Sequence, residues 1–197
     1  MIPLRAEHLP AVVQVHLDAF PGFFLSFLGP SFLREFYGAF LAEEDAVALV
    51  SLKDQGTVTG VIVGTCSPRG FFKRLLARRW WAFCLASTRA LLRQPKVAPR
   101  LWRAFFYRGE APRGVGRALL SSLAVSPHCQ GNGLGRCLVQ RWLESVRSRG
   151  VTGCYLTTDA DGNESVNRFY SSLGWKLELA YATPEGRRMN RYTYDFS

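Results

Sequence analysis

The hydrophobic pattern of the first part of the chain predicts two helices followed by a β-hairpin. Apolar residues recur at helical spacing over 8–20 and again over 30–42. Two runs rich in β-branched residues follow at 46–52 and 57–66, joined by a short polar stretch that ends in Gly56. Because this connection carries turn residues between two strand-length runs, we expect an antiparallel hairpin.

The pattern in the C-terminal part predicts strands that alternate with helices. Strand-length apolar runs occupy residues 117–125, 153–158, 175–181 and 188–196. Helical periodicity covers 134–148 and 164–173, with Gly174 directly after the second helix. The whole order, αα, ββ and then βαβαββ, predicts an α/β (α+β) fold with a mixed sheet.

Between these two parts lies a strongly basic stretch, at about 68–110. The formal net charge of +10 arises from residues 69–117, where 13 Lys or Arg face the single acidic residue Glu110. The stretch is also rich in Phe and Trp, and its helical periodicity is interrupted by two prolines. We therefore expect a basic helical insertion between the hairpin and the C-terminal strands.

Three interpretations of the insertion remain open. Its helices could simply pack on the core and keep the charges on a solvated face. Residues 69–108 could instead contact an anionic membrane or a phosphate-bearing acceptor, since interfacial helices combine Lys and Arg with Trp and Phe. Interleaved aromatic and cationic side chains also suit nucleic acid, but the sequence carries no recognition motif, so a nucleic-acid partner ranks last of the three.

Composition excludes several classes of protein. The chain is 48% hydrophobic, and none of its apolar runs reaches the roughly 18 residues of a membrane span. The N-terminus has no basic segment followed by a continuous apolar stretch. The cysteines are odd in number and form no CxxC pair, which argues against a disulfide framework and a metal site. They are Cys66, Cys84, Cys129, Cys137 and Cys154. We expect a soluble, cytoplasmic protein with reduced, mostly buried thiols.

Three glycines, Gly131, Gly133 and Gly135, crowd the connection between the strand at 117–125 and the helix that follows it. A helix N-terminus leaves about four backbone N–H groups unpaired and carries roughly half a positive charge, so this arrangement suits an anion. The P-loop pattern GxxxxGK[ST] is absent, and the dinucleotide pattern GxGxxG fails at Arg136. Neither nucleotide-binding pattern is therefore supported, and a plain turn or a site for another phosphate remains.

Residues 130–135, Gln-Gly-Asn-Gly-Leu-Gly, fit the pattern [R/Q]-x-x-G-x-[G/A] and resemble the GNAT superfamily of acyl-CoA-dependent N-acyltransferases. Residues 163–175 resemble a second element of that family, N-x-x-A-x-x-[FL]-Y-x-x-x-G-[FW]. The resemblance is loose over 1–66 and good over 115–195, and it does not explain the insertion. It implies a GNAT-like fold, which is a mixed, mostly antiparallel twisted sheet flanked by helices.

The resemblance also implies the domain organisation and the ligand. One acyltransferase domain would span 1–197, with an acetyl-CoA-binding core at about 115–175. Backbone amides of the glycine stretch would hold the pyrophosphate of acetyl-CoA, and the main chain of Val125 would pair with the pantetheine arm. Asn163 would either cap the next helix or touch the same arm. The implied cofactor-binding residues are Val125, Gln130, Gly131, Asn132, Gly133, Leu134, Gly135, Arg136 and Asn163.

Tyr170 is the catalytic residue that the resemblance implies. A thiolate that leaves a thioester gains from a nearby proton donor, and a phenol with a pKa of about 10 is protonated at working pH. The alternative interpretation of Tyr170 is a core aromatic beside Phe169 on an amphipathic helix.

The sequence does not identify a general base. Many relatives carry a Glu on the strand where this chain has Ser121, which cannot take a proton from an amine unaided. The other candidates are equally well explained as solvated turn groups, and a water chain or an amine that arrives neutral is a further alternative. These candidates are Asp159, Asp161, Glu110 and His128.

The functional hypothesis is an N-acetyltransferase that moves an acetyl group from acetyl-CoA to a primary amine. The basic insertion suggests an acceptor such as a phosphate-bearing amino sugar or another anionic small molecule. Through 69–108 the protein would also contact the inner face of the membrane from the cytoplasm. The alternative is a catalytically degenerate acyltransferase-like module that binds an anionic membrane or nucleic acid, which the Ser121 substitution favours.

Overall fold

The structure is a computed structural model that describes residues 1–71, 74, 116–184 and 186–196. The expected basic insertion at about 68–110 lies almost wholly outside the described residues. Glu110 and Cys84 lie outside them as well.

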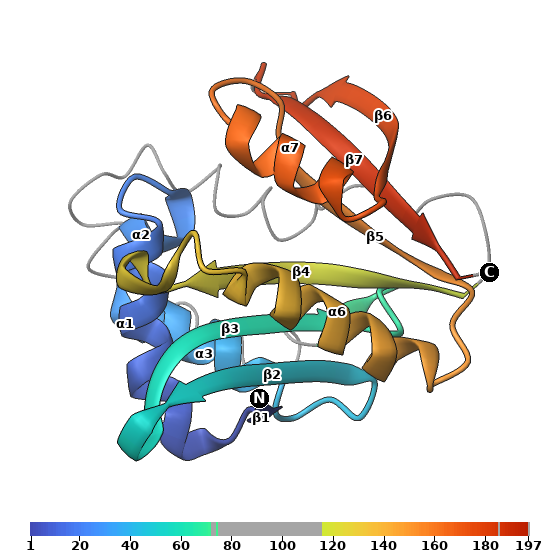
Figure 1. Cartoon of the computed structure of the whole chain (residues 1–197). Helices are drawn as coiled ribbons and strands as arrows, with labels where there is room; N and C mark the ends of the chain where they lie inside the picture. Colours follow the sequence, from blue (N-terminus) through green and yellow to red (C-terminus); the bar gives the residue numbers. More distant parts are fainter. Residues whose placement is uncertain (72–73, 75–115, 185, 197) are drawn as a thin grey trace.

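Within these ranges, seven strands form one sheet in the order β1-β2-β3-β4-β5-β7-β6 (Figure 1). Their bounds are β1 Ile2–Pro3, β2 Ala46–Lys53, β3 Thr57–Thr65, β4 Arg117–Val125, β5 Gly153–Asp159, β6 Lys176–Ala182 and β7 Arg188–Asp195. Every neighbouring pair is antiparallel except β4 and β5, which are parallel. The sheet is therefore mixed and mostly antiparallel, which confirms the expected fold class.

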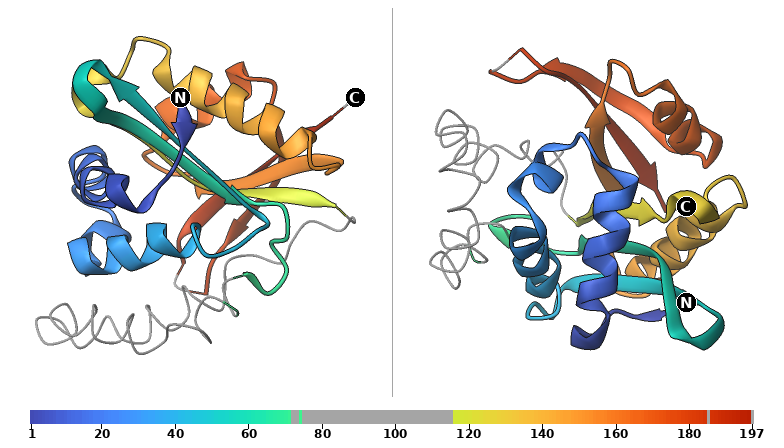
Figure 2. Two further views of the ribbon diagram at one scale, coloured as in Figure 1. Left: turned by 90° about the horizontal axis from the view of Figure 1, so that it is seen from below. Right: turned by 90° about the vertical axis from the view of Figure 1, so that its left-hand side faces the viewer.

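Helices cover both faces of this sheet (Figure 2). The helices α1 and α3 pack on one face and α6 and α7 on the other, and a separate cluster of buried side chains fills each side. Their bounds are α1 Leu9–Ala19, α2 Phe24–Leu28, α3 Pro30–Ala39, α6 Leu134–Arg147 and α7 Glu164–Ser172. Pro30 occupies the first position of α3, where its missing N–H would have had no helical partner.

The helix α6 packs on β3 at two glycines. Gly60 lies under Leu138 and Gly64 under Trp142, so the helix approaches the strand closely. A Cβ atom on Gly64 would lie 2.3 Å from the Leu119 carbonyl oxygen and 2.3 Å from Trp142 Cζ2. Trp142 is fully buried, and its indole N–H donates to the Val47 carbonyl oxygen at 3.1 Å. Both the apolar body and the polar atom of this side chain are therefore satisfied in the core.

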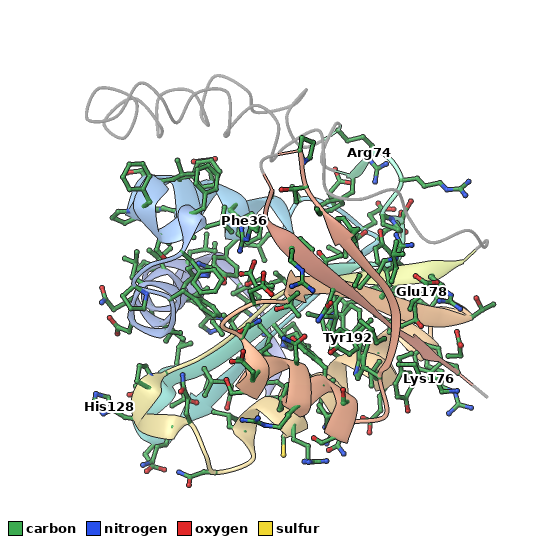
Figure 3. The ribbon with its side chains drawn as sticks, turned by 90° about the horizontal axis from the view of Figure 1, so that it is seen from above. Phe36, Arg74, His128, Lys176, Glu178 and Tyr192 are labelled. Atoms are coloured by element: carbon green, nitrogen blue, oxygen red, sulfur yellow. The ribbon has the colours of Figure 1, made fainter. Side chains whose placement is uncertain are left out.

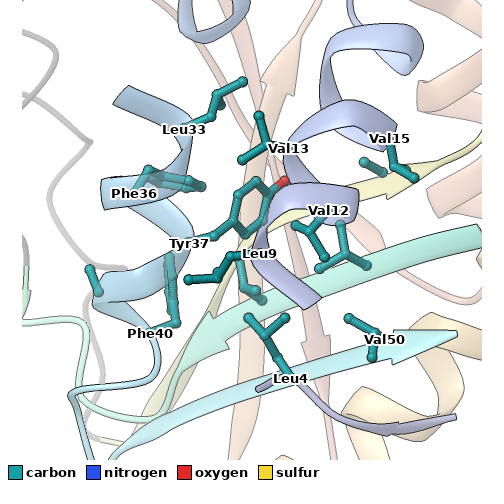
Figure 4. Close-up of a cluster of buried hydrophobic side chains, with 14 of the residues drawn as sticks. Leu4, Leu9, Val12, Val13, Val15, Leu33, Phe36, Tyr37, Phe40 and Val50 are labelled. Atoms are coloured by element: carbon teal, nitrogen blue, oxygen red, sulfur yellow. The ribbon is translucent and has the colours of Figure 1, made fainter. Parts of the chain in front are cut away.

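The opposite face is filled by an aliphatic and aromatic cluster beneath α1 and α3 (Figure 4). Val12 of α1 and Val50 of β2 are fully buried there. Phe36 packs edge-on against both Tyr37 and Phe40 along α3. Tyr37 stands between the two helices, with its hydroxyl directed toward α1 (Figure 4).

The expectation of mostly buried thiols is wrong for the described cysteines. All four are free, but only Cys154 is buried, while Cys137 is exposed and Cys66 and Cys129 are intermediate. Cys137 is exposed on the polar side of α6, although the next residue, Leu138, faces the core. Consecutive residues of an amphipathic helix point in different directions, so one can be exposed and the next buried. None of the helices in the described ranges is long and apolar enough to cross a membrane.

Candidate active site

The parallel strands β4 and β5 are paired only at their N-terminal ends. Arg117–Leu119 of β4 pair with Gly153–Tyr155 of β5. Beyond these residues the strands diverge (Figure 1), and no described strand pairs with this edge of β4 along residues 120–125. A strand edge with unpaired N–H and C=O groups can take an extended ligand as an added strand. Residues 120–125 of β4, where β5 diverges, are therefore a candidate binding site for an extended ligand.

A β-bulge interrupts β4 at the start of this open edge. The pairing with β3 passes from Gly64 opposite Leu120 to Val63 opposite Ser122, so Ser121 is the extra residue of the bulge. Side-chain direction changes across the bulge, because Leu120 packs in the α6 cluster whereas Ser122 contacts Tyr37 of α3. The bulge thereby turns the Ser122 hydroxyl to the α1 and α3 face.

The glycine stretch joins β4 to α6 at the open end of the same edge. Gly131 and Gly133 have φ values of 79° and 77°, a left-handed conformation that favours glycine, and a Cβ on either would meet no atom within 4 Å. Gly133 is the N-cap of α6, and none of the described side chains caps the helix. Among the described residues, the first N–H groups of α6 therefore have no side-chain acceptor, as an anion site requires.

Gln130 and Gly135 have local structural roles in this stretch. The Gln130 side-chain amide donates to the Val125 carbonyl oxygen at 3.0 Å and so ties the loop to the end of β4. A Cβ on Gly135 would lie 3.4 Å from Phe169 Cζ, which places the first turn of α6 directly against α7.

The predicted proton donor, Tyr170, lies on α7 with its ring in the core. It is 6% exposed and packs against Phe169, Trp175 and Tyr192. Burial raises the pKa of Tyr170 well above its usual value, which keeps the phenol protonated at neutral pH. The Tyr170 hydroxyl has no hydrogen-bond partner among the described residues, so it is available to a ligand.

Asn163 occupies the N-cap position of α7, but it makes no capping hydrogen bond. Its side-chain amide donates to Thr158 Oγ1 at 2.7 Å and to the Asp159 carbonyl oxygen at 3.3 Å. The capping interpretation is therefore wrong, because these two bonds direct the side chain back to the end of β5. Asn163 braces the turn between β5 and α7.

Asn167 is a residue that the sequence analysis missed. Its amide donates to the carbonyl oxygens of Asp159 and Asn163, and its Oδ1 accepts from Asn190 and from the Tyr192 hydroxyl, each at 3.0 Å or less. This one side chain thus joins α7 to β5 and β7 and positions the helix that carries Tyr170. The available signal was an Asn inside a helix, where that residue is unfavourable without a specific partner.

The described candidates for a general base are held in other contacts or are exposed. Arg187 binds the Asp159 carboxylate through two nitrogens, and Asp161 forms a 3.3 Å ion pair with Arg188. His128 is exposed and projects from the edge of the molecule, away from Tyr192 (Figure 3). Ser121 is half-buried at the bulge. Glu110 lies outside the described residues.

Comparison with known proteins agrees with this geometry. The sequence profile described as "Acetyltransferase (GNAT) family" matches residues 9–175. The chain belongs to the acetyltransferase (GNAT) family. This confirms the predicted superfamily, and the match spans both β4 and the glycine stretch that follows it.

Two curated relatives are mycothiol acetyltransferases. The protein of Nocardiopsis dassonvillei is 40% identical over 65 residues, or 32% of this chain and 19% of the relative, and that of Nocardia farcinica is 40% identical over 63 residues, or 30% and 20%. The chain thus matches about a fifth of the length of these relatives.

Solved structures share the fold at low sequence identity. A protein assigned to the GNAT family from Desulfovibrio desulfuricans has a TM-score of 0.63 at 16% identity, covering 96% of this chain and 92% of that one. The ribosomal-protein-S18-alanine N-acetyltransferase from Escherichia coli has a TM-score of 0.60 at 16% identity, covering 99% and 92%. A protein assigned as a streptothricin acetyltransferase from Bacillus anthracis, solved with acetyl coenzyme A, has a TM-score of 0.53 at 11% identity, covering 82% and 68%.

Proposed function

We propose that this protein is an N-acetyltransferase that moves the acetyl group of acetyl-CoA to a primary amine. The observation that carries the proposal is the open edge of β4, which leads directly to the uncapped N-terminus of α6. An extended chain that ends in a phosphate fits these two features together, because one offers main-chain partners and the other offers unpaired N–H groups.

The residues around the glycine stretch fit such a ligand. The α6 terminus has no side-chain cap among the described residues, and within the same ranges the exposed Arg136 makes only a long 3.5 Å contact to Ser172 Oγ. In the proposed site, main-chain groups of Val125 bind the pantetheine arm, and main-chain N–H groups at the α6 terminus bind the pyrophosphate. Asn163 supports the site by bracing the β5–α7 turn. The residues proposed to hold the pyrophosphate end are Gln130, Gly131, Asn132, Gly133, Leu134, Gly135 and Arg136.

Tyr170 is the proposed acid. Acetyl-CoA, when bound, supplies the acetyl group as a thioester. As the amine forms its bond to the acetyl carbon and the carbon–sulfur bond breaks, the Tyr170 hydroxyl gives its proton to the sulfur. The excess proton of the amine passes to water, because the described carboxylates Asp159 and Asp161 are already paired with arginines. Water returns a proton to the Tyr170 oxygen, so the net change is one proton moved from the amine to the thiol.

The proposed acceptor is an anionic small molecule with a primary amine, such as a phosphate-bearing amino sugar. Support comes from the sequence, in which residues 69–117 carry 13 Lys or Arg against one acid. The same segment, at 69–108, is the proposed contact with an anionic membrane surface. The second candidate function is a non-catalytic basic module, which the Ser121 substitution favours.

Two measurements test the proposed function. Isothermal titration with acetyl-CoA asks whether the donor binds, and release of free thiol asks whether a panel of amines accepts the acetyl group. We expect binding and an amine-dependent thiol release that is greatest for amines carrying phosphate. Binding without release for every amine supports the non-catalytic module, and absence of acetyl-CoA binding overturns the proposed acetyltransferase.

A further inference from the structure

A buried chain of hydrogen bonds links three elements on the α1 and α3 face. His16 Nδ1 of α1 lies 2.8 Å from the Tyr37 hydroxyl of α3, and that hydroxyl lies 3.2 Å from Ser122 Oγ of β4. His16 is 3% exposed and Tyr37 is 0% exposed, while Ser122 is half-buried. The proposed function, as described so far, uses none of these three residues.

The outer end of this chain lies on the open edge of β4. Ser122 follows the β-bulge and stands midway between Leu119, the last residue paired with β5, and Val125. Among the described residues, its hydroxyl contacts only the Tyr37 hydroxyl. The chain of hydrogen bonds therefore runs from the protein interior to the divergence of β4 and β5.

The inner end fixes the direction of the chain. His16 Nε2 is buried and has no hydrogen-bond partner in the part of the chain that the structure describes. Burial lowers the pKa of His16 to about 4, so the ring is neutral at pH 7 and carries one proton. An orphaned buried N–H is rare in proteins, so the proton belongs on Nδ1, where it has an acceptor, rather than on Nε2.

This tautomer sets the role of each hydroxyl. His16 Nδ1–H donates to the Tyr37 oxygen, and the Tyr37 hydroxyl then donates to Ser122 Oγ. Burial raises the pKa of Tyr37, which keeps its hydroxyl protonated and able to donate. Because Ser122 Oγ accepts from Tyr37, the Ser122 proton takes no part in that bond and is available to a ligand.

We propose that Ser122 is a catalytic hydrogen-bond donor to the acetyl carbonyl oxygen, and that Tyr37 and His16 are the residues that position it. The inference rests on the proposed function. A donor suits a carbonyl oxygen, on which negative charge grows during acyl transfer. The polarity of the chain therefore suits the acetyl carbonyl oxygen as its target.

Isotope-edited infrared spectroscopy tests this contact without any acceptor. The carbonyl band of bound acetyl-CoA, labelled with ¹³C at the carbonyl carbon, should lie at lower frequency than that of free acetyl-CoA. Ser122→Ala should return the band toward the free value, and Tyr37→Phe should return it part of the way. Ser51→Ala is the matched control, because it removes a buried hydroxyl from β2, where Ser51 accepts from Thr59 at 3.2 Å.

Kinetics and nitrogen NMR supply the other readouts. Ser122→Ala should lower kcat on the order of 100-fold while the dissociation constant of acetyl-CoA changes less than about 2-fold. The ¹⁵N shifts of His16 should show a protonated Nδ1 and a bare Nε2. Since the chain has three histidines, substitution of His8 and His128 in turn assigns the third set of signals.

The outcomes separate the inference from the function it rests on. An unshifted band and normal kcat in Ser122→Ala, with a wild type that binds and reacts, overturn the inference alone. A proton on Nε2 of His16 overturns it as well, and this measurement needs no ligand. Failure of the wild type to bind acetyl-CoA overturns the proposed function and the inference together.

Discussion

The contact of α6 with β3 differs from the His16–Tyr37 pair on the other face of the sheet. Toward α6, the glycines of β3 allow Trp142 to pack closely against the strand. The indole N–H, which is the only polar group of the Trp142 side chain, donates to the Val47 carbonyl oxygen. Toward α1 and α3, an apolar cluster encloses His16 and Tyr37, and one ring nitrogen of His16 has no partner among the described residues. A buried polar atom without a partner lowers stability, typically by about 1–3 kcal/mol. The difference indicates that the contact of α6 with β3 is optimised for packing, whereas the His16–Tyr37 pair holds a polar group in a set direction.

The largest expected effect is on the packed face. Gly64→Ala should lower the free energy of unfolding by about 3 kcal/mol or more, because the new Cβ would overlap both a backbone oxygen and Trp142. Urea denaturation measures the loss. Gly22→Ala is the control, since a Cβ there meets nothing within 4 Å, and it should change stability by less than about 0.5 kcal/mol. Equal stabilities for the two variants would contradict the close approach of α6.

The second effect concerns the acid on α7. Tyr170→Phe removes one hydroxyl and little volume, so turnover should fall by roughly 10- to 1000-fold with acetyl-CoA binding nearly unchanged. Steady-state kinetics and titration measure the two quantities separately. Tyr194→Phe, which alters a half-buried ring that packs on Trp175, should keep full turnover. Full turnover in Tyr170→Phe would reduce that residue to a packing role.

The third effect compares the two ends of α6. Gly133 and Gly150 both have φ of 77°, and a Cβ on either meets nothing within 4 Å, so Val at each position carries a similar backbone strain. Gly133→Val should weaken acetyl-CoA binding by about 10-fold or more, because it shields the N–H groups of the helix N-terminus. Gly150→Val should leave the affinity unchanged. Titration of both variants with acetyl-CoA measures the two affinities. Equal affinities would show that the glycine stretch takes no part in binding acetyl-CoA.

The smallest effect is the pH dependence of the polar face. The pKa of His16 is about 4 in the folded protein against 6.5 for the unfolded chain, so the unfolded state binds a proton first as pH falls. The stability present above pH 6.5 should therefore decline toward pH 4, by about 1 kcal/mol at pH 5.5. Denaturation midpoints of the wild type and His16→Gln at pH 7 and 5.5 measure this. The denaturation midpoint of His16→Gln should fall less between pH 7 and pH 5.5 than that of the wild type. Equal falls for the two proteins would contradict the burial of His16.

Local pattern was sufficient for most elements of the fold. The predicted strand at 117–125 coincides with β4, and α6 and α7 end within one residue of prediction, because each has a clear hydrophobic period. The strand β1, of two residues, and the helix α2, of five, were missed because neither is long enough to show a period. Both were therefore visible only in the tertiary structure.

The site was predictable only where neighbours in sequence are also neighbours in space. The glycine stretch and the turn before α7 are contiguous, so their motifs could be recognised. The hydrogen-bond chain joins residues 16, 37 and 122, and no local pattern connects them. The direction of the Ser122 side chain depends on the bulge at Ser121. This bulge arises from the pairing of β4 with β3, and it cannot be recognised from the order of apolar and polar residues in β4.

The open edge of β4 has a consequence for how fast the protein would be degraded when its ligand is scarce. Under the proposed function, acetyl-CoA completes the sheet as an added strand, and it binds the folded chain but not the unfolded one. At 100 times its dissociation constant such a ligand adds about 2.7 kcal/mol to stability. Amide hydrogens along residues 120–125 should then exchange more slowly as acetyl-CoA rises, and a protease that attacks the opened chain should act more slowly. In a cell short of acetyl-CoA, the enzyme would be degraded faster, so its abundance would follow the supply of its own donor.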